Sequence, residues 1–293
     1  MEYPERMRMR RTLTLSLAAA ALAAGPFGSV HAGEAPLTLV ACAPGFPGNT
    51  EQAQPTMDDF AKAVTHAAGW PAGRLAAVYH DELAPGLERL RADDAALALI
   101  PLPLFLRYRE ELGLRPLLEV EDEDSVEQRW SLVARRAAVA APAALSGWSI
   151  AGMPGYAPEF VRRVALDGYG PLPADVEIDF TGRVLGALRK AARGSRTAVL
   201  LDSVQTSSMS ALPFAGELDV LFRSPAMPGS LLCSVGDRID DGQAAALRSA
   251  LLSLGESAAG ADVLAELRLR RFRPVDTERL GEIESRYDGG GGS

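Results

Sequence analysis

The sequence has few of the side chains on which metal binding and much of enzyme catalysis depend. It contains three histidines in 293 residues, and His31 falls in an N-terminal leader, which leaves His66 and His80. Two histidines exclude a histidine-rich metal centre and offer little for a serine–histidine–aspartate triad. No Walker loop and no Gly-x-Gly-x-x-Gly segment follows a predicted strand. We therefore expect a protein that is not an enzyme and that needs neither a metal ion nor a cofactor.

Positive charge is also scarce. The formal net charge is −8 at pH 7, and Lys62 and Lys190 are the only lysines. Because nucleic acids are bound through basic surfaces, this charge argues against a nucleic-acid partner. No apolar run beyond the leader reaches the roughly 20 residues that a membrane-spanning helix needs. The length, together with a hydrophobic content of 47%, suits a globular protein of two lobes.

The first 32 residues have the pattern of a cleavable signal peptide. Four arginines lie before a short Ala/Leu-rich stretch, Thr12 to Ala24, and Val30-His31-Ala32 supplies the small residues of a cleavage site. The apolar stretch is too short to cross a bilayer. We expect cleavage near Ala32 and a mature monomer in a bacterial periplasm.

The two cysteines, Cys42 and Cys233, belong to separate predicted strands. Export to an oxidising compartment makes a disulfide between them an open alternative. Sequence alone does not test the geometry that a disulfide requires. We favour two buried free thiols.

Apolar runs alternate with amphipathic segments along the rest of the chain. Ala95–Pro101 is apolar throughout, which suits a strand covered on both faces of a parallel sheet. The predicted strands are Leu37–Cys42, Leu75–Tyr79, Ala95–Pro101, Arg129–Arg135, Trp148–Gly152, Asp175–Phe180, Thr197–Asp202, Asp219–Arg223 and Ser230–Val235. The predicted helices are Pro55–Ala68, Ala84–Ala92, Leu104–Leu112, Pro158–Gly168, Arg183–Arg193, Asp240–Gly255, Ala259–Leu267 and Asp276–Arg286. This alternation predicts parallel β–α–β units with right-handed crossovers.

An acidic run, Glu119–Glu127, separates two such series and predicts a solvated loop, since it lacks the ligand spacing of a calcium site. We predict an α/β fold of two lobes, each a mostly parallel sheet flanked by helices. The C-terminal helices, without strands of their own, are expected to cover the first lobe. The predicted boundaries are 33–128 for the first part of lobe 1, 129–238 for lobe 2, 239–288 for the C-terminal helices of lobe 1, and 289–293 for a disordered tail. Arg129–Arg135 and Ser230–Arg238 are expected to cross between the lobes and form a hinge beside a cleft.

Ligands of open α/β sheets bind beyond the carboxyl ends of the strands, where helix N-termini also point. The candidate ligand-binding residues at these corners are Phe46, Asn49, Tyr79, His80, Tyr156, Thr181, Arg183 and Asp202. Ordinary structural roles stay open for them: a helix cap for Thr181 or Asp202, core packing for the tyrosines and a surface turn for His80. The positive charge of Arg183 is unfavourable at the N-terminus of the helix that it begins. Because helix stability does not explain this charge, we favour a role in ligand binding.

The order of these segments resembles the phosphate-, phosphite- and phosphonate-type periplasmic solute-binding proteins of ABC transporters. The matching segments are Tyr79–Leu90 with Ala96–Pro101, Arg107–Leu117, Trp130–Arg135, Phe222–Pro228 and Phe272–Asp276. The resemblance implies the type 2 periplasmic-binding-protein fold, with two lobes joined by two crossover strands. It also implies a small ligand and a permease partner.

The chain departs from this family at two corners of the second lobe. Where members typically have a Ser/Thr cluster, this sequence has Pro154-Gly155-Tyr156-Ala157-Pro158. Arg183 stands where a histidine is expected, whereas Asp202 falls where the family often has an acidic residue. Because arginine binds carboxylates and phosphates through two hydrogen bonds, a small anion is still expected.

We therefore expect a periplasmic solute-binding protein that closes its lobes over a small anionic ligand, phosphonate- or phosphate-like or a carboxylate. The closed form would be presented to an inner-membrane ABC permease. The alternative is a periplasmic sensor or accessory protein of the same fold, docked on a membrane receptor. An enzyme of this fold, like those of the menaquinone pathway, is disfavoured by the export signal and the scarcity of histidine.

Overall fold

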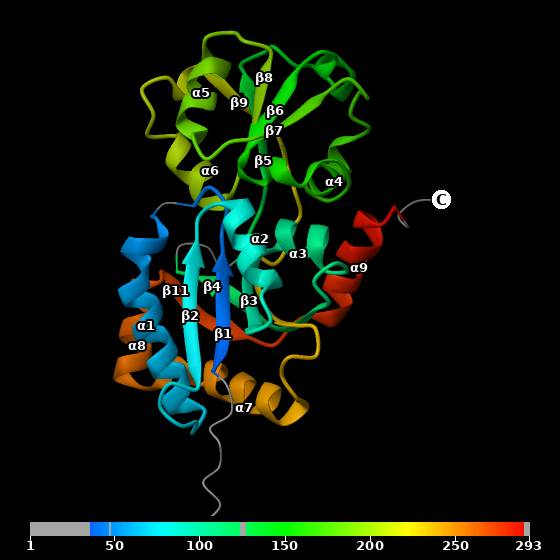
Figure 1. Ribbon diagram of the computed structural model, residues 1–293. Helices are drawn as coiled ribbons and strands as arrows, with labels where there is room; N and C mark the ends of the chain where they lie inside the picture. The colour runs from blue at the N-terminus through cyan, green and yellow to red at the C-terminus, as the bar shows by residue number, and fades with distance from the viewer. Residues whose placement is uncertain (1–35, 47, 124–126, 290–293) are drawn as a thin grey trace, which may run out of the picture. The chain divides into compact units, whose positions relative to one another are not determined.

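The computed structural model describes residues 36–46, 48–123 and 127–289, which form two β-sheets with helices packed against them (Figure 1). The predicted signal peptide, and the predicted tail beyond Gly289, lie outside the described residues. Within those residues, no helix combines the length and the hydrophobicity that crossing a bilayer requires. The predicted α/β class and its two-sheet arrangement are confirmed.

The first sheet has six strands in the order β11-β4-β10-β3-β1-β2. They are β1 (Leu37–Cys42), β2 (Leu75–His80), β3 (Ala95–Pro101), β4 (Leu114–Asp122), β10 (Ser230–Val235) and β11 (Leu269–Arg273). β1 pairs in parallel with β2 and β3, whereas β10 is antiparallel to β3 and β4, and β11 to β4. β1 is buried along its whole length, and in β3 only Leu99 is partly exposed. These continuously apolar strands occupy the middle of the sheet, as their sequences predict.

Apolar side chains cover both faces of this sheet, because alternate residues of β1 point into two different cores. Val40 and Cys42 belong to one core, and Leu39 belongs to the other. The helices packed around it are α1 (Thr50–Ala67), α2 (Leu83–Arg91), α3 (Leu102–Tyr108), α7 (Asp241–Leu252), α8 (Ala258–Glu266) and α9 (Thr277–Tyr287). α1 contacts α8, and Phe60 of α1 stacks on Phe272 of β11 with ring centroids 6.2 Å apart.

The second sheet has five strands in the order β7-β6-β8-β5-β9. They are β5 (Ser131–Arg135), β6 (Ser149–Gly152), β7 (Glu177–Phe180), β8 (Thr197–Leu201) and β9 (Leu218–Arg223). Its helices are α4 (Pro158–Phe160), α5 (Val184–Ala192) and α6 (Ser203–Met209). The short helical turns of this part are η1 (Pro142–Leu145), η2 (Met153–Tyr156), η3 (Val161–Ala165), η4 (Asp167–Tyr169) and η5 (Ala215–Glu217). A further turn, η6 (Leu254–Glu256), lies between α7 and α8. β6 is parallel to β7 and β8, and β5 is antiparallel to β8 and β9.

The acidic run is not a solvated loop over its first part, so that prediction is wrong there. Glu119 and Glu121 lie in β4 and are 1% and 2% exposed. Arg273 and Arg279 donate to the Glu119 carboxylate at 2.7 and 3.1 Å, and Arg271 donates to Glu121 at 2.9 Å. The cause is β11, an arginine-rich strand in a region where the sequence predicts only helices. It pairs with β4 and supplies the charges that let these glutamates be buried.

The second crossing between the sheets also differs from the prediction. Ser230–Arg238 was expected to belong to the second lobe, but β10 pairs with β3 and β4 of the first sheet. The chain therefore returns to the first sheet between Arg223 and Ser230. The reason is that β10 is almost fully buried and apolar, which suits a central strand.

Cys42 and Cys233 are free and buried. They lie on β1 and β10, and β3 separates these two strands. Two strand spacings, about 9–10 Å, exceed the Cα separation that a disulfide can bridge. Burial also raises the pKa of Cys42 to about 12 and raises the pKa of Cys233, so neither thiol ionises at neutral pH.

We predict that Ellman's reagent will detect no thiol in the folded protein and two thiols per chain after denaturation without reductant. Burial blocks the reaction in the native state, and the absence of a disulfide leaves both sulfurs free once the chain unfolds. Finding no thiol in the denatured, unreduced protein would show that the two cysteines are linked.

Candidate functional site

A small cavity of about 60 Å³ lies where loops of the two sheets meet. Its lining residues are Pro44, Phe46, Pro101, Pro103, Asp122, Gln128, Trp130, Met153, Pro154, Tyr156, Asp202, Val204, Gly229 and Ser230. Most of them follow the carboxyl end of a strand: β1, β3, β6 or β8. This is the edge at which open α/β sheets bind ligands. The cavity is therefore the candidate ligand site.

The corner after β6 supplies one wall of the cavity. An added Cβ on Gly155 would lie 2.2 Å from the carbonyl oxygen of Asp179, so only glycine lets this turn pack against β7. The turn directs Tyr156, which is buried, to the cavity, with its ring 5.9 Å from that of Phe180. Burial raises the pKa of Tyr156, so its hydroxyl stays protonated.

Asp202 is the partly buried carboxylate that begins α6. Its Oδ1 accepts the backbone N–H of Gln205 at 2.7 Å, and the Gln205 side chain accepts the backbone N–H of Asp202 at 3.2 Å. This reciprocal cap is the role that the sequence left open beside ligand binding. Burial raises the pKa of Asp202, against the lowering effect of hydrogen bonds from the backbone of Gln205 and Val204.

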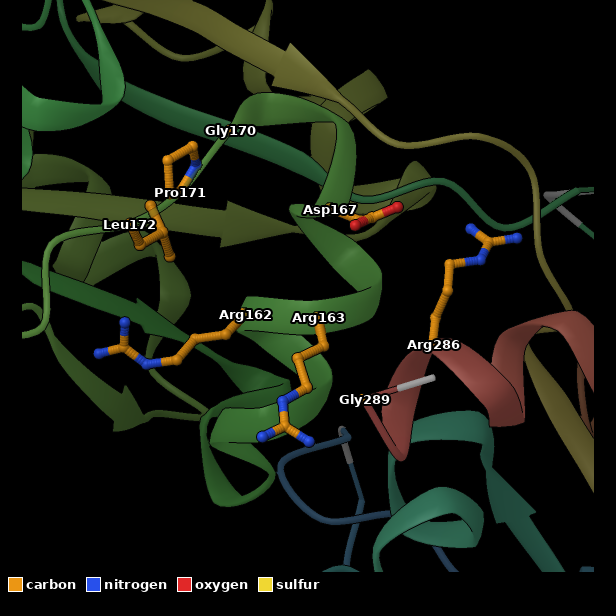
Figure 2. A pocket seen from close by; sticks show the side chains of 8 residues that line it. All are labelled: Arg162, Arg163, Asp167, Gly170, Pro171, Leu172, Arg286 and Gly289. Carbon is orange, nitrogen blue, oxygen red and sulfur yellow. The ribbon is translucent and has the colours of Figure 1, made fainter. Parts of the chain in front are cut away.

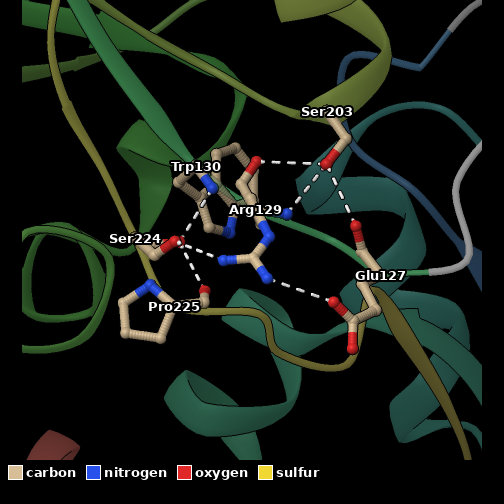
Figure 3. Close-up of polar contacts among 6 residues, drawn as sticks. All are labelled: Glu127, Arg129, Trp130, Ser203, Ser224 and Pro225. Carbon is tan, nitrogen blue, oxygen red and sulfur yellow. Dashed lines mark hydrogen bonds and ion pairs between the residues drawn. The ribbon is translucent and has the colours of Figure 1, made fainter.

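The two segments that cross between the sheets are hydrogen-bonded side by side (Figure 3). The backbone N–H of Trp130 donates to Oγ of Ser224 at 2.9 Å, and the N–H of Ser224 donates to the carbonyl of Trp130 at 2.8 Å. Gln128 and Met227 form an isolated antiparallel β-bridge. Ser203, at the start of α6, accepts the N–H of Arg129 at 2.8 Å, which ties this helix to the first crossing. Paired crossings of this kind can act as a hinge.

The loop after β1 approaches the end of β7 and the loop that follows it. An added Cβ on Gly45 would lie 3.3 Å from Cα of Gly182 and 3.3 Å from the ring of Phe180. Gly45 has φ of +84°, which glycine adopts without strain. The glycines on both loops therefore permit a close approach of one lobe to the other.

Of the eight candidate residues, the structure places Phe46, Tyr156 and Asp202 on the cavity. Asn49 instead caps α1, because its side chain accepts the N–H of Gln52 at 2.8 Å. Thr181 accepts the N–H of Arg183 at 3.0 Å, and Arg183 is exposed at the start of α5. A helix cap accounts for the contact of Asn49, whereas the predicted cap role of Thr181 is wrong, because Arg183 is the N-cap of α5 and the Thr181 hydroxyl accepts only the N–H two residues ahead, in the turn before the helix.

Tyr79 and His80 end β2, a strand at the edge of the first sheet. Tyr79 packs against the apolar core, and burial, with the nearby charge of Asp81, raises its pKa to about 12. Burial lowers the pKa of His80, and Arg89 lowers it further. Neither residue lines the cavity, so the three candidates that share it are the ones after β1, β6 and β8.

Several lining residues escaped the sequence interpretation. Pro101 ends β3 and Pro103 follows it, and the rule about strand ends that identified Phe46 and Asp202 would have found them. Trp130 lies in the first crossing segment. It lines the cavity because this segment pairs with the second crossing, and the sequence does not show that pairing. Asp122 ends β4, and the interpretation of the acidic run as a loop concealed it.

A second, wider hollow of about 460 Å³ lies between η3–η4 and the end of α9 and contains three arginines (Figure 2). Arg162 donates to the carbonyls of Pro173 and Val176, and Arg163 donates to the carbonyl of Tyr287. Arg286 forms an ion pair with Glu282 at 3.4 Å. These guanidinium groups hold chain segments together, so we assign no ligand role to this hollow. In the part of the chain that the structure describes, no three potential metal ligands cluster.

Two mixed sheets joined by paired crossings, with a cavity at the strand ends, are the features of the two-lobed type 2 periplasmic-binding-protein fold. Solved structures share this fold. They include XAC2383 from Xanthomonas citri bound to chloride ion, with a TM-score of 0.67 and 16% identity over 86% of this chain and 97% of that chain. PhnD1 from Prochlorococcus marinus in complex with methylphosphonate has a TM-score of 0.60 and 13% identity, over 86% of this chain and 98% of that chain.

A family model described as the periplasmic substrate-binding protein of ABC phosphonate transporters matches residues 48–280, and the chain belongs to this family. A binding-protein component of an ABC phosphonate transporter from Pseudomonas aeruginosa, PA3383, has a TM-score of 0.55 and 16% identity over 86% of this chain and 88% of that chain. No curated protein sequence matches the chain. The family consists of periplasmic substrate-binding proteins and not of enzymes, as the sequence predicts.

Proposed function

We propose that this protein captures a small ligand in the periplasm by closing two lobes over it and delivers it to an inner-membrane ABC permease. The observation that carries the proposal is the cavity itself, which is lined by loops of both sheets and by the first crossing segment. A ligand held by both lobes binds the closed form better than the open form. Only such a difference in affinity can shift the population toward closure.

We place the moving parts on either side of the paired crossings. One lobe comprises residues 33–128 and 230–288, which include β10 and the C-terminal helices, and the other comprises residues 129–229. Rotation would occur at Gln128–Trp130 and Ser224–Met227, where backbone hydrogen bonds join the two crossings. The Gly45–Gly182 approach supports a closed arrangement of the loops. The protein would act as a monomer after cleavage of its leader near Ala32.

Family membership favours a small anion as the ligand, which the sequence also predicts. In this chain, however, Arg183, the residue offered for an anion, is exposed and does not line the cavity. The size of the cavity supports a ligand of few atoms.

A thermal-shift panel tests the proposed function. The panel contains phosphate, phosphonates, small carboxylates, amino acids and small ammonium compounds. We expect at least one compound to raise the unfolding temperature, because a ligand at 100 times its Kd stabilises a protein by about 2.7 kcal/mol. Silence across the panel would contradict the proposal.

A further inference from the structure

We infer that the end of α9, Tyr287–Gly289, is a strap that joins the two lobes outside the cavity and favours their closed arrangement in the ligand-free protein. Lobe 1 is residues 33–128 and 230–288, and lobe 2 is residues 129–229. The inference rests on the proposed function, because it concerns the equilibrium between open and closed lobes. It assigns part of that equilibrium to residues that do not line the cavity.

The start of α9 is fixed to lobe 1. Asp276, the N-cap of α9, donates its backbone N–H to the buried carboxylate of Glu119 at 3.0 Å, and Arg279 donates to the same carboxylate at 3.1 Å. Glu119 lies in β4 of the first sheet. Leu280 and Ile283 of the same helix are buried in the core. The first turns of α9 therefore move with lobe 1.

The end of α9 is held by one arginine from each lobe. Arg109, the C-cap of α3 in lobe 1, donates to both carboxylate oxygens of Asp288 at 2.6 and 2.7 Å, and its guanidinium carbon lies 5.4 Å from the centroid of the Tyr287 ring. Arg163 of η3, in lobe 2, donates to the backbone carbonyl of Tyr287 at 2.9 Å. An added Cβ on Gly289 would lie 3.4 Å from Nη1 of Arg163, and Figure 2 shows these two residues at the junction. The strap is therefore a connection between the lobes that is separate from the two crossings.

Apolar packing between the lobes supports these polar contacts. α9 contacts η3, and α3 contacts α4. One core cluster contains buried side chains of all four elements: Phe105 of α3, Phe160 of α4, Val161 and Val164 of η3, and Ile283 of α9. Separating these elements would return apolar surface to water, which costs free energy. The junction of α9 with η3 therefore resists displacement of one lobe from the other.

The strap occurs together with the close approach of Gly45 and Gly182, so it belongs to the arrangement in which the loops of the two lobes lie near each other. A rotation at the crossings that separates those loops also displaces η3 from α9. A contact that opposes this displacement raises the closed fraction of the ligand-free protein. Because the apparent Kd is the intrinsic Kd divided by the competent fraction, the strap would strengthen ligand binding without touching the ligand.

Truncation of the chain tests the inference without a ligand. One variant ends at Arg286 and lacks the strap, and its control ends at Gly289 and lacks only residues 290–293. Spin labels at Lys62→Cys on α1 and Lys190→Cys on α5 report the distance between the lobes by pulsed electron–electron double resonance. We expect the distance distribution of the variant that ends at Arg286 to move and broaden relative to the full chain. The control should match the full chain.

Arg163→Met, with Arg162→Met as its control, assigns the effect to the bond between the lobes. Both arginines donate to backbone carbonyls, but the acceptors of Arg162 are Pro173 and Val176, within lobe 2 itself. We expect Arg163→Met to move the distribution in the same direction as the truncation and Arg162→Met to leave it unchanged. Added to the variant that ends at Arg286, Arg163→Met should have no further effect, because its acceptor is already absent.

Two results would overturn the inference. One is the same distance distribution for the full chain and for the variant that ends at Arg286. The other is an equal change in Arg163→Met and Arg162→Met, which would show a general loosening of η3. Neither result depends on a ligand, so the strap can fail while the thermal-shift panel supports the proposed function. For a compound that the panel identifies, we expect the variant that ends at Arg286 to bind at least threefold more weakly than the control, and equal affinity would also contradict the inference.

Discussion

Replacement of Glu119 by alanine is expected to lower the free energy of unfolding by about 3 kcal/mol, since it removes one partner of a buried ionic cluster. The carboxylate is 1% exposed and accepts from Arg273, Arg279 and the backbone N–H of Asp276. Alanine would leave Arg273 without its counter-charge, Arg279 with only the more distant carboxylate of Asp276 at 3.9 Å, and the Asp276 amide without an acceptor. It would also weaken the attachment of β11 and α9 to β4. Urea unfolding followed by circular dichroism measures the loss.

Glu111→Ala is the matched control for this substitution. Glu111 also forms an ion pair, with Arg91, but both side chains are about half exposed. Exposed pairs of this kind contribute roughly 0–1 kcal/mol because water and salt screen them. If both variants lose the same small amount of stability, the Glu119 cluster does not hold β4, β11 and α9 together.

Replacement of Phe60 by alanine is expected to cost about 3–5 kcal/mol of unfolding free energy, the usual range for a large aromatic in a core. Phe60 is fully buried and stacks on Phe272, so its removal opens a cavity between α1 and β11. These elements come from opposite ends of the chain. The substitution should therefore loosen the contact that holds the C-terminal region on the first sheet, and chemical denaturation quantifies it.

Phe46→Ala provides the contrast, because the same side chain is lost from a different environment. Phe46 is 42% exposed and borders the cavity. Its removal should change the unfolding free energy by less than about 1 kcal/mol, as is usual for surface substitutions, but it should weaken ligand binding. A large loss of stability in Phe46→Ala with unchanged binding would place Phe46 in the core and remove it from the site.

The parts of the fold that could be predicted from the sequence are those with a local signal. Ala95–Pro101 is apolar along its length, and it forms the buried strand β3 that this pattern predicts. β4 and β11 could not be predicted in this way. Their glutamates and arginines look like surface residues. Burial of these charges becomes favourable only when the fold brings Arg271 to Glu121, 150 positions away in the sequence. Local patterns do not contain such pairings.

The same reason explains which site residues could be predicted. Phe46, Tyr156 and Asp202 follow strands that were predicted correctly, so a rule about strand ends locates them. Asn49 also follows a predicted strand, but its side chain caps the next helix, and only the structure separates these two uses. Trp130 lies at the junction of two segments that are distant in sequence. Its place beside the cavity depends on the packing of the whole chain.

Family membership and the lining of the cavity inform different aspects of function. The family model covers most of the chain and establishes a periplasmic substrate-binding protein of the phosphonate type. The side chains that contact a ligand vary within such a fold, because function depends on the site that the fold carries. In this chain the corner after β6 contains Pro154 and Pro158, and Asp202 lines the cavity.

Lobe closure is tested most directly by the distance between two spin labels, one on each lobe. Pulsed electron–electron double resonance measures this distance. Lys62→Cys on α1 and Lys190→Cys on α5 give exposed labelling sites, and the two native thiols are buried and should not react. We predict that a compound that raises the unfolding temperature in the panel, added at a saturating concentration, moves the maximum of the distance distribution and narrows the distribution. An unchanged distribution, with the compound shown to be bound, would contradict closure of two lobes over a ligand.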